Sequence, residues 1–153
     1  MHSAPIARVL GLLLIIFSLT MLTPVFVAFI YDEATKRMFV LAFSITLIVG
    51  LLFWLPARSK TIELRTRDGF VVTVLFWLVL STFGSLPFML SDGLQLSFTD
   101  ALFESVSGLT TTGATVISGL DNLPKSILYY RQQLQWLGGI GIVVIAVAIL
   151  PML

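Results

Sequence analysis

The sequence predicts an all-α membrane protein, in which transmembrane helices accompany one helix that enters the membrane and stops part way, followed by an extended strand. Three observations predict this fold class. Of the 153 residues, 58% are hydrophobic and only 11% are charged, whereas an average soluble domain has about 25% charged residues. Four stretches are long and apolar enough to cross a bilayer. Between the last two lies a segment that is too apolar for an ordinary solvated loop.

The composition also excludes several classes of function. The formal net charge is +1, and the charges form short clusters without a basic patch that would bind nucleic acid. The chain has no cysteine, which removes disulfides, thiolate metal sites and cysteine nucleophiles. Its one histidine is His2, so a buried catalytic dyad or zinc site built on histidine is excluded. We therefore expect neither an enzyme nor a cofactor.

The four predicted spans are Pro5–Ile30 and residues 38–55, 70–90 and 134–153. About 20 apolar residues are needed to cross the roughly 30 Å hydrocarbon core. A cleaved signal peptide is the competing interpretation of the first stretch, because Arg8 precedes its apolar run. The run is long and lacks a small-x-small cleavage site, which favours a retained helix.

The charged residues predict the orientation in the membrane. Short loops rich in lysine and arginine face the cytoplasm. The loop 57–68 contains four such residues: Arg58, Lys60, Arg65 and Arg67. Arg8 would share that side, so the N-terminus is predicted to be cytoplasmic. The opposite side would carry four cations and six acids: Lys36, Arg37, Lys125, Arg131, Asp32, Glu33, Asp92, Asp100, Glu104 and Asp121.

Residues 91–133, between the third and fourth spans, contain a shorter helix. Ser97 or Thr99 can cap its start. Apolar and small residues then recur at helical spacing: Phe98, Ala101, Leu102, Ser105, Val106 and Leu109. Three turns reach about 18 Å, which is too short to span, so this helix enters the membrane and stops. For Asp100 and Glu104, near its outer end, partnership with the helix dipole is favoured over the attraction of cations to a mouth.

The segment 110–116, TTTGATV, returns from that helix. Non-helical backbone at membrane depth is tolerated only where protein buries it or where it lines a watery cavity. Threonine favours extended backbone, and Gly113 permits φ values that let consecutive carbonyls point the same way. Such oxygens replace the water shell of an alkali cation. The residues alone leave two interpretations open: an ion-lining strand or a buried structural re-entrant loop.

Small residues elsewhere predict close contacts between helices. Pro87 is expected to end or kink the third span. A patch of small polar residues precedes it, and we expect this patch to pack against another helix, with the wall of a cavity as the alternative: Ser81, Thr82, Gly84 and Ser85. The fourth span contains three glycines that would let another backbone approach: Gly138, Gly139 and Gly141.

Tyr129, Tyr130 and Arg131 precede those glycines, and this combination is typical of the outer membrane interface. In the alternative interpretation, Arg131 holds the returning strand by hydrogen bonds to its carbonyls. The residues do not choose between these two interpretations.

The motifs around the strand resemble those of a known family. The matching residues are Phe103, Glu104, Ser105, Ser107, Gly108 and Leu109, then 110–115, then Leu123, Pro124, Tyr130, Arg131, Gln132, Gly138, Gly139 and Gly141. In this combination the chain resembles the Trk/Ktr/HKT potassium transporter family, and within it the bacterial TrkH/TrkG branch. The resemblance covers the whole chain. The combination is specific, whereas TTTG by itself is not.

The resemblance implies a domain organisation and a function. Residues 1–68 would hold two N-terminal transmembrane helices and the cytoplasmic basic loop, and residues 69–153 a first helix–pore-loop–helix repeat with its filter at 110–116. In that family four such repeats surround one pore. The K⁺ ligands would be carbonyls of Thr111, Thr112 and Gly113, with Ala114 or Thr110 in addition. K⁺ would be the transported ion, taken up across the bacterial inner membrane without a cofactor.

The resemblance also implies partners: membrane lipid, a second copy of a longer four-repeat chain in a homodimer, and a TrkA-like cytoplasmic nucleotide-binding regulatory subunit. This sequence departs from the family because it holds one repeat and ends at AVAILPML without interfacial anchors. We therefore expect the N-terminal part of a longer transporter, with a homotetramer of short chains as the alternative. Two rival functions stay open: a non-conducting membrane scaffold, and an intramembrane enzyme, which the missing histidine base disfavours.

Overall fold

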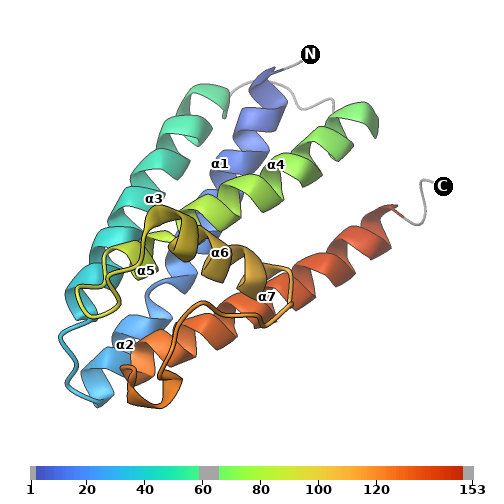
Figure 1. Ribbon diagram of the computed structural model, residues 1–153. Helices are drawn as coiled ribbons and strands as arrows, with labels where there is room; N and C mark the ends of the chain where they lie inside the picture. Colours follow the sequence, from blue (N-terminus) through green and yellow to red (C-terminus); the bar gives the residue numbers. More distant parts are fainter. Residues whose placement is uncertain (1–2, 59–65, 150–153) are drawn as a thin grey trace.

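The computed structural model describes residues 3–58 and 66–149, and within them the chain forms helices and loops without a strand (Figure 1). In chain order the elements are α1 (Ser3–Thr20), α2 (Thr23–Ile30), α3 (Lys36–Ala57), α4 (Thr66–Gly84), α5 (Leu86–Met89), α6 (Phe98–Leu109), the short 3-10 helix η1 (Leu120–Asn122) and α7 (Lys125–Ile149). Among the described residues, three segments are long and apolar enough to cross a membrane: Pro5–Ile30, Lys36–Ala57 and Gly69–Met89. The prediction of an all-α membrane protein is confirmed.

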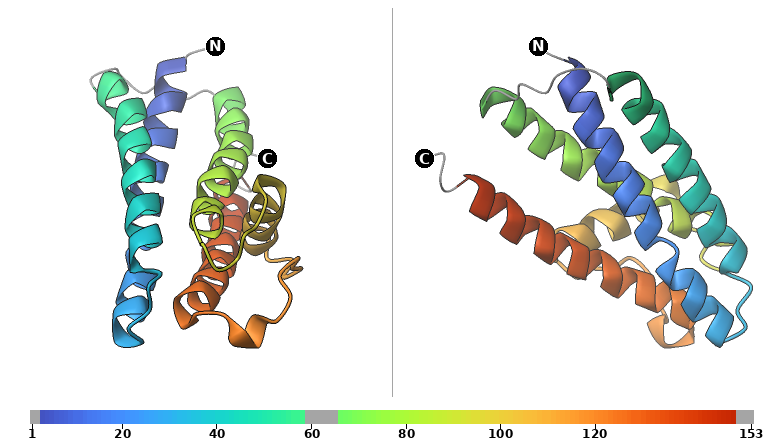
Figure 2. Two further views of the ribbon diagram at one scale, coloured as in Figure 1. Left: turned by 60° about the vertical axis from the view of Figure 1, so that its left-hand side comes forward. Right: turned by 180° about the vertical axis from the view of Figure 1, so that it is seen from behind.

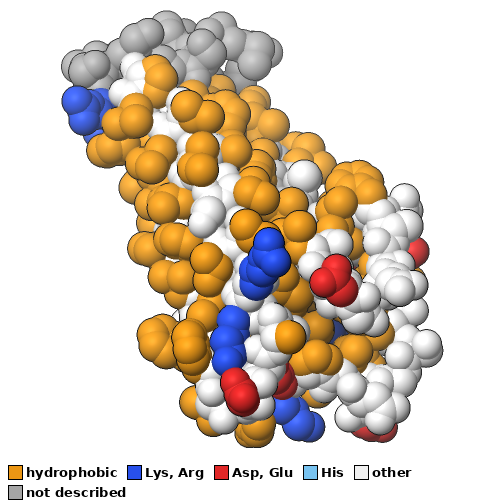
Figure 3. Space-filling view, turned by 90° about the vertical axis from the view of Figure 1, so that its left-hand side faces the viewer, with side chains coloured by type: hydrophobic (Ala, Val, Ile, Leu, Met, Phe, Trp, Pro, Cys, Tyr) orange, Lys and Arg blue, Asp and Glu red, His pale blue; other side chains and the backbone are white. Residues whose placement is uncertain are grey.

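Helices α1 and α3 form a tight antiparallel pair along one side of the molecule (Figures 1 and 2). They cross where two glycines meet, since a Cβ on Gly11 would lie only 2.8 Å from the carbonyl oxygen of Gly50. Small residues allow this close approach between membrane helices. The outer surface of the pair is largely hydrophobic (Figure 3). Large exposed apolar surfaces of this kind mark contact with lipid or protein.

Different connections between helices lie at the two ends of the molecule. The N-terminus, the end of α3 and the start of α4 lie at one end, whereas the α2–α3 and η1–α7 connections lie at the other (Figure 1). Lys60 and Arg65 of the predicted basic loop lie outside the described residues. The cytoplasmic location of that loop stays a prediction.

Pro24 divides the predicted first span into two helices. Proline lacks an N–H, and its ring collides with the carbonyl four residues earlier, so α1 ends at Thr20 and α2 begins at Thr23. The freed Thr20 oxygen accepts a hydrogen bond from Gln133 Nε2 of α7 (2.7 Å). The Thr23 hydroxyl lies within hydrogen-bond distance of that oxygen (2.7 Å) and of the Gln133 amide oxygen (2.9 Å). Gln133 thereby supplies a hydrogen-bond donor to the Thr20 carbonyl, which the break leaves without a partner in its own helix.

The third predicted span is also interrupted, because a new helix begins after Ser85. Pro87 occupies the first turn of α5, which confirms the prediction that it ends or kinks this span. Next to the break, the Tyr130 hydroxyl of α7 donates to the carbonyl oxygen of Gly84 (2.9 Å). The Tyr130 ring packs against phenylalanines of α3 and α5. Tyr130 is 1% exposed, so it does not face lipid as an aromatic-belt residue does, and its hydroxyl finds a partner in the core instead.

Helix α7 begins at Lys125, well before residue 134, the predicted start of the fourth span. Its first turn is capped from the N-terminal part of the chain. The Glu33 carboxylate, in the α2–α3 connection, accepts hydrogen bonds from the N–H groups of Lys125 (2.6 Å) and Ser126 (3.1 Å). First-turn amides have no partner within their own helix, and a carboxylate there also favours the positive end of the helix dipole. Glu33 therefore joins the α1–α3 unit to α7.

We expect Glu33→Gln to destabilise the fold by about 1 kcal/mol, as loss of a helix cap does. Partial burial acts to raise the pKa of the Glu33 carboxyl, but hydrogen bonds from Ser126, Lys125 and Thr35 outweigh it and lower the pKa below its usual value. The stabilisation is therefore complete above the usual glutamate pKa of about 4.3 and is lost as the pH falls through the lower, folded-state pKa. Thermal unfolding in detergent at pH 7 and pH 3 measures both effects.

Asp32→Asn is the matched control, because Asp32 is the neighbouring acid but its side chain is 94% exposed and pairs with Lys36. Exposed pairs of this spacing contribute little to stability. Equal losses in the two variants, or a Glu33→Gln effect that persists at pH 3, would contradict the capping role.

Candidate functional site

The short helix α6 is fixed at its start by Ser97. The Ser97 oxygen accepts a hydrogen bond from the Asp100 N–H (3.2 Å), and its hydroxyl donates to the Asp100 carboxylate (2.7 Å). Of the two predicted caps, Ser97 is the one observed, and Asp100 is the acid in the first turn. The helix has 12 residues, about 18 Å, as predicted. It packs against α4 and α7 (Figure 2).

The C-terminal end of α6 closes in a pair of backbone hydrogen bonds. The Thr111 N–H donates to the Gly108 oxygen (2.9 Å), and the Thr112 N–H donates to the Ser107 oxygen (2.9 Å). Thr111 has φ +57°. This is the Schellman arrangement, which usually places glycine at the left-handed position. A β-branched residue is uncommon there and is strained by roughly 1–2 kcal/mol. Such strain collects at functional positions.

The segment 110–116 continues as exposed, non-helical backbone. Gly113 is a second left-handed residue (φ +75°), and its N–H also donates to the Ser107 oxygen (3.3 Å). Among the described residues, no hydrogen bond reaches the carbonyl oxygens of Thr110, Thr111, Thr112 and Gly113. The chain thus brings four of the predicted site residues together with free carbonyl oxygens. The fifth, Ala114, differs, because its carbonyl accepts a hydrogen bond from the Ser107 hydroxyl (2.6 Å).

Glu104 holds the second half of this segment. Its carboxylate accepts hydrogen bonds from the Thr115 hydroxyl, from the Val116 N–H (2.7 Å) and from Arg131 Nε (3.0 Å). Glu104 is 3% exposed, so the prediction that it serves as a helix-dipole partner near the outer end is wrong. The physical reason is its helical position, because it shares the buried face of α6 with Ala101 and Gly108.

Arg131 is the cation that pairs with this buried acid. It is 8% exposed and approaches the Glu104 carboxylate through Nε, so its side chain does not reach out to the membrane surface as a snorkelling cation does. The alternative prediction, that Arg131 bonds to carbonyls of the strand, is wrong in its partner, since Arg131 binds the Glu104 carboxylate, and it is Glu104 that bonds to the strand. A buried acid needs a buried partner. This requirement is the sequence signal that would have paired Glu104 with Arg131.

The glycines of α7 were predicted to permit close approach, and one of them is essential for it. A Cβ on Gly138 would lie 1.8 Å from the carbonyl oxygen of Leu109, the last residue of α6. A Cβ on Gly139 or Gly141 would meet its nearest neighbour only at 3.9 or 3.8 Å. The backbone just before Thr110 therefore rests directly on α7 at Gly138.

In the patch before Pro87, Gly84 packs against α6 as predicted, whereas Thr82 is exposed. A Cβ on Gly84 would lie 2.5 Å from Ser105 Oγ. The hydroxyls of Thr82 and Ser85 donate to carbonyls of their own helix, at 2.8 and 2.7 Å. Helix α6 is thus held on both sides by glycines, Gly84 from α4 and Gly138 from α7.

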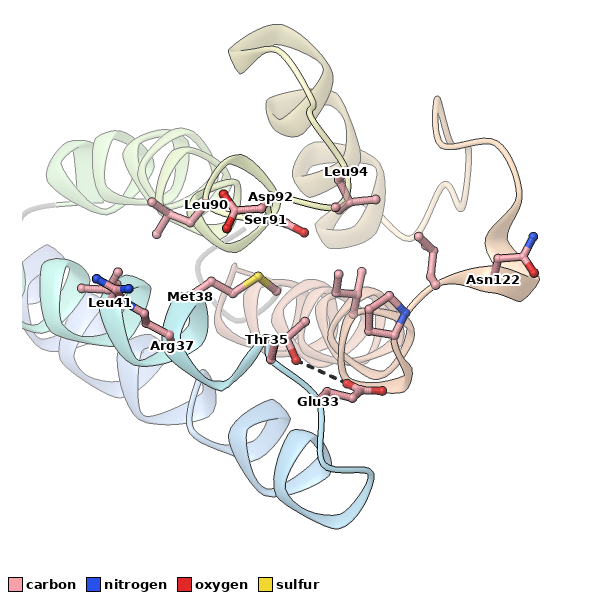
Figure 4. A pocket seen from close by; sticks show the side chains of 15 residues that line it. Glu33, Thr35, Arg37, Met38, Leu41, Leu90, Ser91, Asp92, Leu94 and Asn122 are labelled. Carbon is pink, nitrogen blue, oxygen red and sulfur yellow. Dashed lines mark hydrogen bonds between the residues drawn. The ribbon is translucent and has the colours of Figure 1, made fainter.

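A separate pocket of about 860 Å³ lies near the start of α3 and the start of α7 (Figure 4). Its lining includes Glu33, Arg37, Met38, Asp92 and Asn122. The lining contains no residue of 110–116, so this pocket is separate from the four free carbonyls. The four free carbonyls of residues 110–113 offer oxygen atoms beside the partly negative C-terminal end of α6. Such a set of groups suits a hard cation.

Comparison with known proteins adds a family and several relatives. The family model TrkH, described as a cation transport protein, matches residues 35–153. A Trk system potassium uptake protein TrkH from Halomonas elongata is 61% identical over 148 residues, which is 97% of this chain. The protein of the same name from Escherichia coli strain K12 is 54% identical over 153 residues, the full chain.

A solved structure is similar over nearly the same extent. The crystal structure of the potassium transporter TrkH from Vibrio parahaemolyticus matches 99% of this chain, with a TM-score of 0.94 and 56% identity. The match covers 32% of that chain, and the two relatives above are covered to 31% and 32%. This chain therefore spans about a third of the length of the proteins that it matches.

Proposed function

The chain belongs to the TrkH family of cation transport proteins, and from this premise we propose that it takes part in K⁺ uptake across the bacterial inner membrane. The supporting observation is the set of four carbonyl oxygens from Thr110 to Gly113, free of hydrogen bonds among the described residues and placed directly after a short helix. Carbonyl oxygens in a row replace the hydration shell of K⁺. The helix end adds partial negative charge at the same place.

One strand meets an ion from one side only, whereas a dehydrated cation needs oxygens all round. In this proposal the segment 110–116 is therefore one of several filter strands around a common pore. The others come from further repeats of a longer chain or, alternatively, from further copies of this one. Residues 1–68 then form an N-terminal helical unit, and residues 69–153 form the first pore repeat.

The proposal places the N-terminus in the cytoplasm. It is supported by the arrangement in Figure 1, where the N-terminus and the end of α3, next to Arg58, lie together, opposite the connection that holds Asp32 and Glu33. The proposed partners are K⁺, membrane lipid, a second copy of the longer chain in a homodimer, and a TrkA-like cytoplasmic nucleotide-binding subunit.

Gly113→Ser tests the filter. The experiment uses a chimaera, in which this segment replaces the matching third of the Vibrio parahaemolyticus TrkH. A Cβ on Gly113 has its nearest neighbour at 3.8 Å, so space is available, but φ is +75°. A serine would strain this turn by roughly 1–2 kcal/mol or move it. We expect the preference for K⁺ over Na⁺ to fall about tenfold, measured as ion uptake by potassium-uptake-deficient cells.

Gly119→Ser is the matched control. Gly119 has φ +70° and also a nearest neighbour at 3.8 Å, but it lies beyond the carbonyl row. It should cause a similar loss of stability without a change of ion preference. If the two variants transport alike and retain the original preference, the segment is a structural re-entrant loop and the chain a non-conducting scaffold.

A further inference from the structure

We propose that Ser107 is a positioning residue of the filter, which fixes the strand from the helix side and withdraws the Ala114 carbonyl from the row of ion ligands. The inference rests on the proposed function and deepens it. It states which carbonyls face the ion and which side chain decides this.

Ser107 contacts the strand through two different groups. Its backbone oxygen accepts hydrogen bonds from the N–H groups of Thr112 (2.9 Å) and Gly113 (3.3 Å). Its hydroxyl donates to the carbonyl oxygen of Ala114 (2.6 Å). These contacts lie on both sides of the left-handed turn at Gly113. One residue of α6 therefore fixes the backbone before and after that turn.

The direction of the backbone dipoles changes between these contacts. At Thr112 and Gly113 the amide is bonded to the helix and the carbonyl is free, whereas at Ala114 the carbonyl is bonded to the helix. A carbonyl that accepts a hydrogen bond from a hydroxyl has one of its two lone pairs engaged. Here it is also held on the helix side of the strand. The ligand row therefore ends at Gly113.

Burial makes the Ser107 hydroxyl difficult to replace. Ser107 is 5% exposed, so little water reaches the Ala114 carbonyl from this side. Without the hydroxyl, that carbonyl is free to turn toward the ion, and the turn at Gly113 loses one support. The Glu104 contacts to Thr115 and Val116 remain. The variant should therefore change ion preference more than it changes the stability of the fold.

Ser107→Ala in the chimaera is the test, with Ser105→Ala as the matched control. Ser105 is a fully buried serine of the same helix whose hydroxyl has no hydrogen-bond partner among the described residues. The preference for K⁺ over Na⁺ should fall about two- to tenfold in Ser107→Ala, as loss of one hydrogen bond predicts. It should be unchanged in Ser105→Ala. Ser107→Thr retains the hydroxyl and should keep the original preference.

The outcomes separate this inference from the proposed function. If Gly113→Ser shifts the ion preference but Ser107→Ala does not, Ser107 only packs and the inference is wrong, while the filter stands. If neither variant shifts the preference, the filter proposal fails as well. If Ser107→Ala does not accumulate in the membrane, Ser107→Thr decides. If Ser107→Thr accumulates and keeps the original preference for K⁺ over Na⁺, the role of the hydroxyl is supported. If its preference shifts, or if it also fails to accumulate, the inference is overturned.

Discussion

We expect Gly138→Ala to reduce K⁺ uptake by the chimaera about tenfold or more. The added Cβ would lie 1.8 Å from the Leu109 oxygen and 2.6 Å from the Leu109 carbonyl carbon. These are backbone atoms, so no side-chain rotation relieves the collision, and α6 and α7 must separate. Overpacking of this kind costs about 1–3 kcal/mol. Because Leu109 directly precedes Thr110, the displacement reaches the carbonyl row. Uptake and the thermal unfolding midpoint of the purified chimaera are the measurements.

Gly139→Ala is the control for this prediction, since its nearest neighbour, Thr111 Cγ2, lies at 3.9 Å. Alanine is favoured over glycine in a helix by about 1 kcal/mol, so this variant should be as stable as the original or slightly more stable. Its transport should be unchanged. If Gly138→Ala and Gly139→Ala behave alike, α6 does not rest on α7 as the structure describes.

Glu104→Gln should cause the second large effect, because it leaves Arg131 buried without its charged partner. Breaking a buried ion pair at one partner costs about 3–5 kcal/mol. The glutamine also offers one acceptor oxygen where the carboxylate serves Thr115, Val116 and Arg131. We expect a large drop in the unfolding midpoint and the loss of selective K⁺ uptake.

Asp100→Asn provides the comparison, as an acid one turn earlier whose bonds to Ser97 are exposed. It should lower stability by about 1 kcal/mol as a weakened cap and leave ion preference unchanged. The pair itself is tested by Arg131→Met, alone and combined with Glu104→Gln. The double variant should lose less stability than the sum of the two single variants. Strict additivity would show that Glu104 and Arg131 do not act as a pair.

Several features of this fold were predictable because their signals are local. The apolar run Lys36–Ala57 is long enough to span by itself, and Ser97 precedes the start of α6 in the sequence as a helix cap does. The Pro87 break follows equally from a residue that cannot continue a helix. Pro24 carries the same signal as Pro87, although the first span was predicted as continuous. The four residues with free carbonyls, Thr110 to Gly113, are likewise contiguous in sequence.

By itself, then, the sequence determined the membrane-spanning helices, the short helix α6 and the hydroxyl-rich return after it, since each depends on residues within one or two turns of each other. The tertiary structure alone decided what Glu104, Arg131 and Gln133 do. Glu104 bonds to Arg131 across 27 positions and Gln133 to Thr20 across 113. Burial obliges a polar group to find a partner. Which partner it finds depends on how the helices pack, and no periodicity within one helix encodes that.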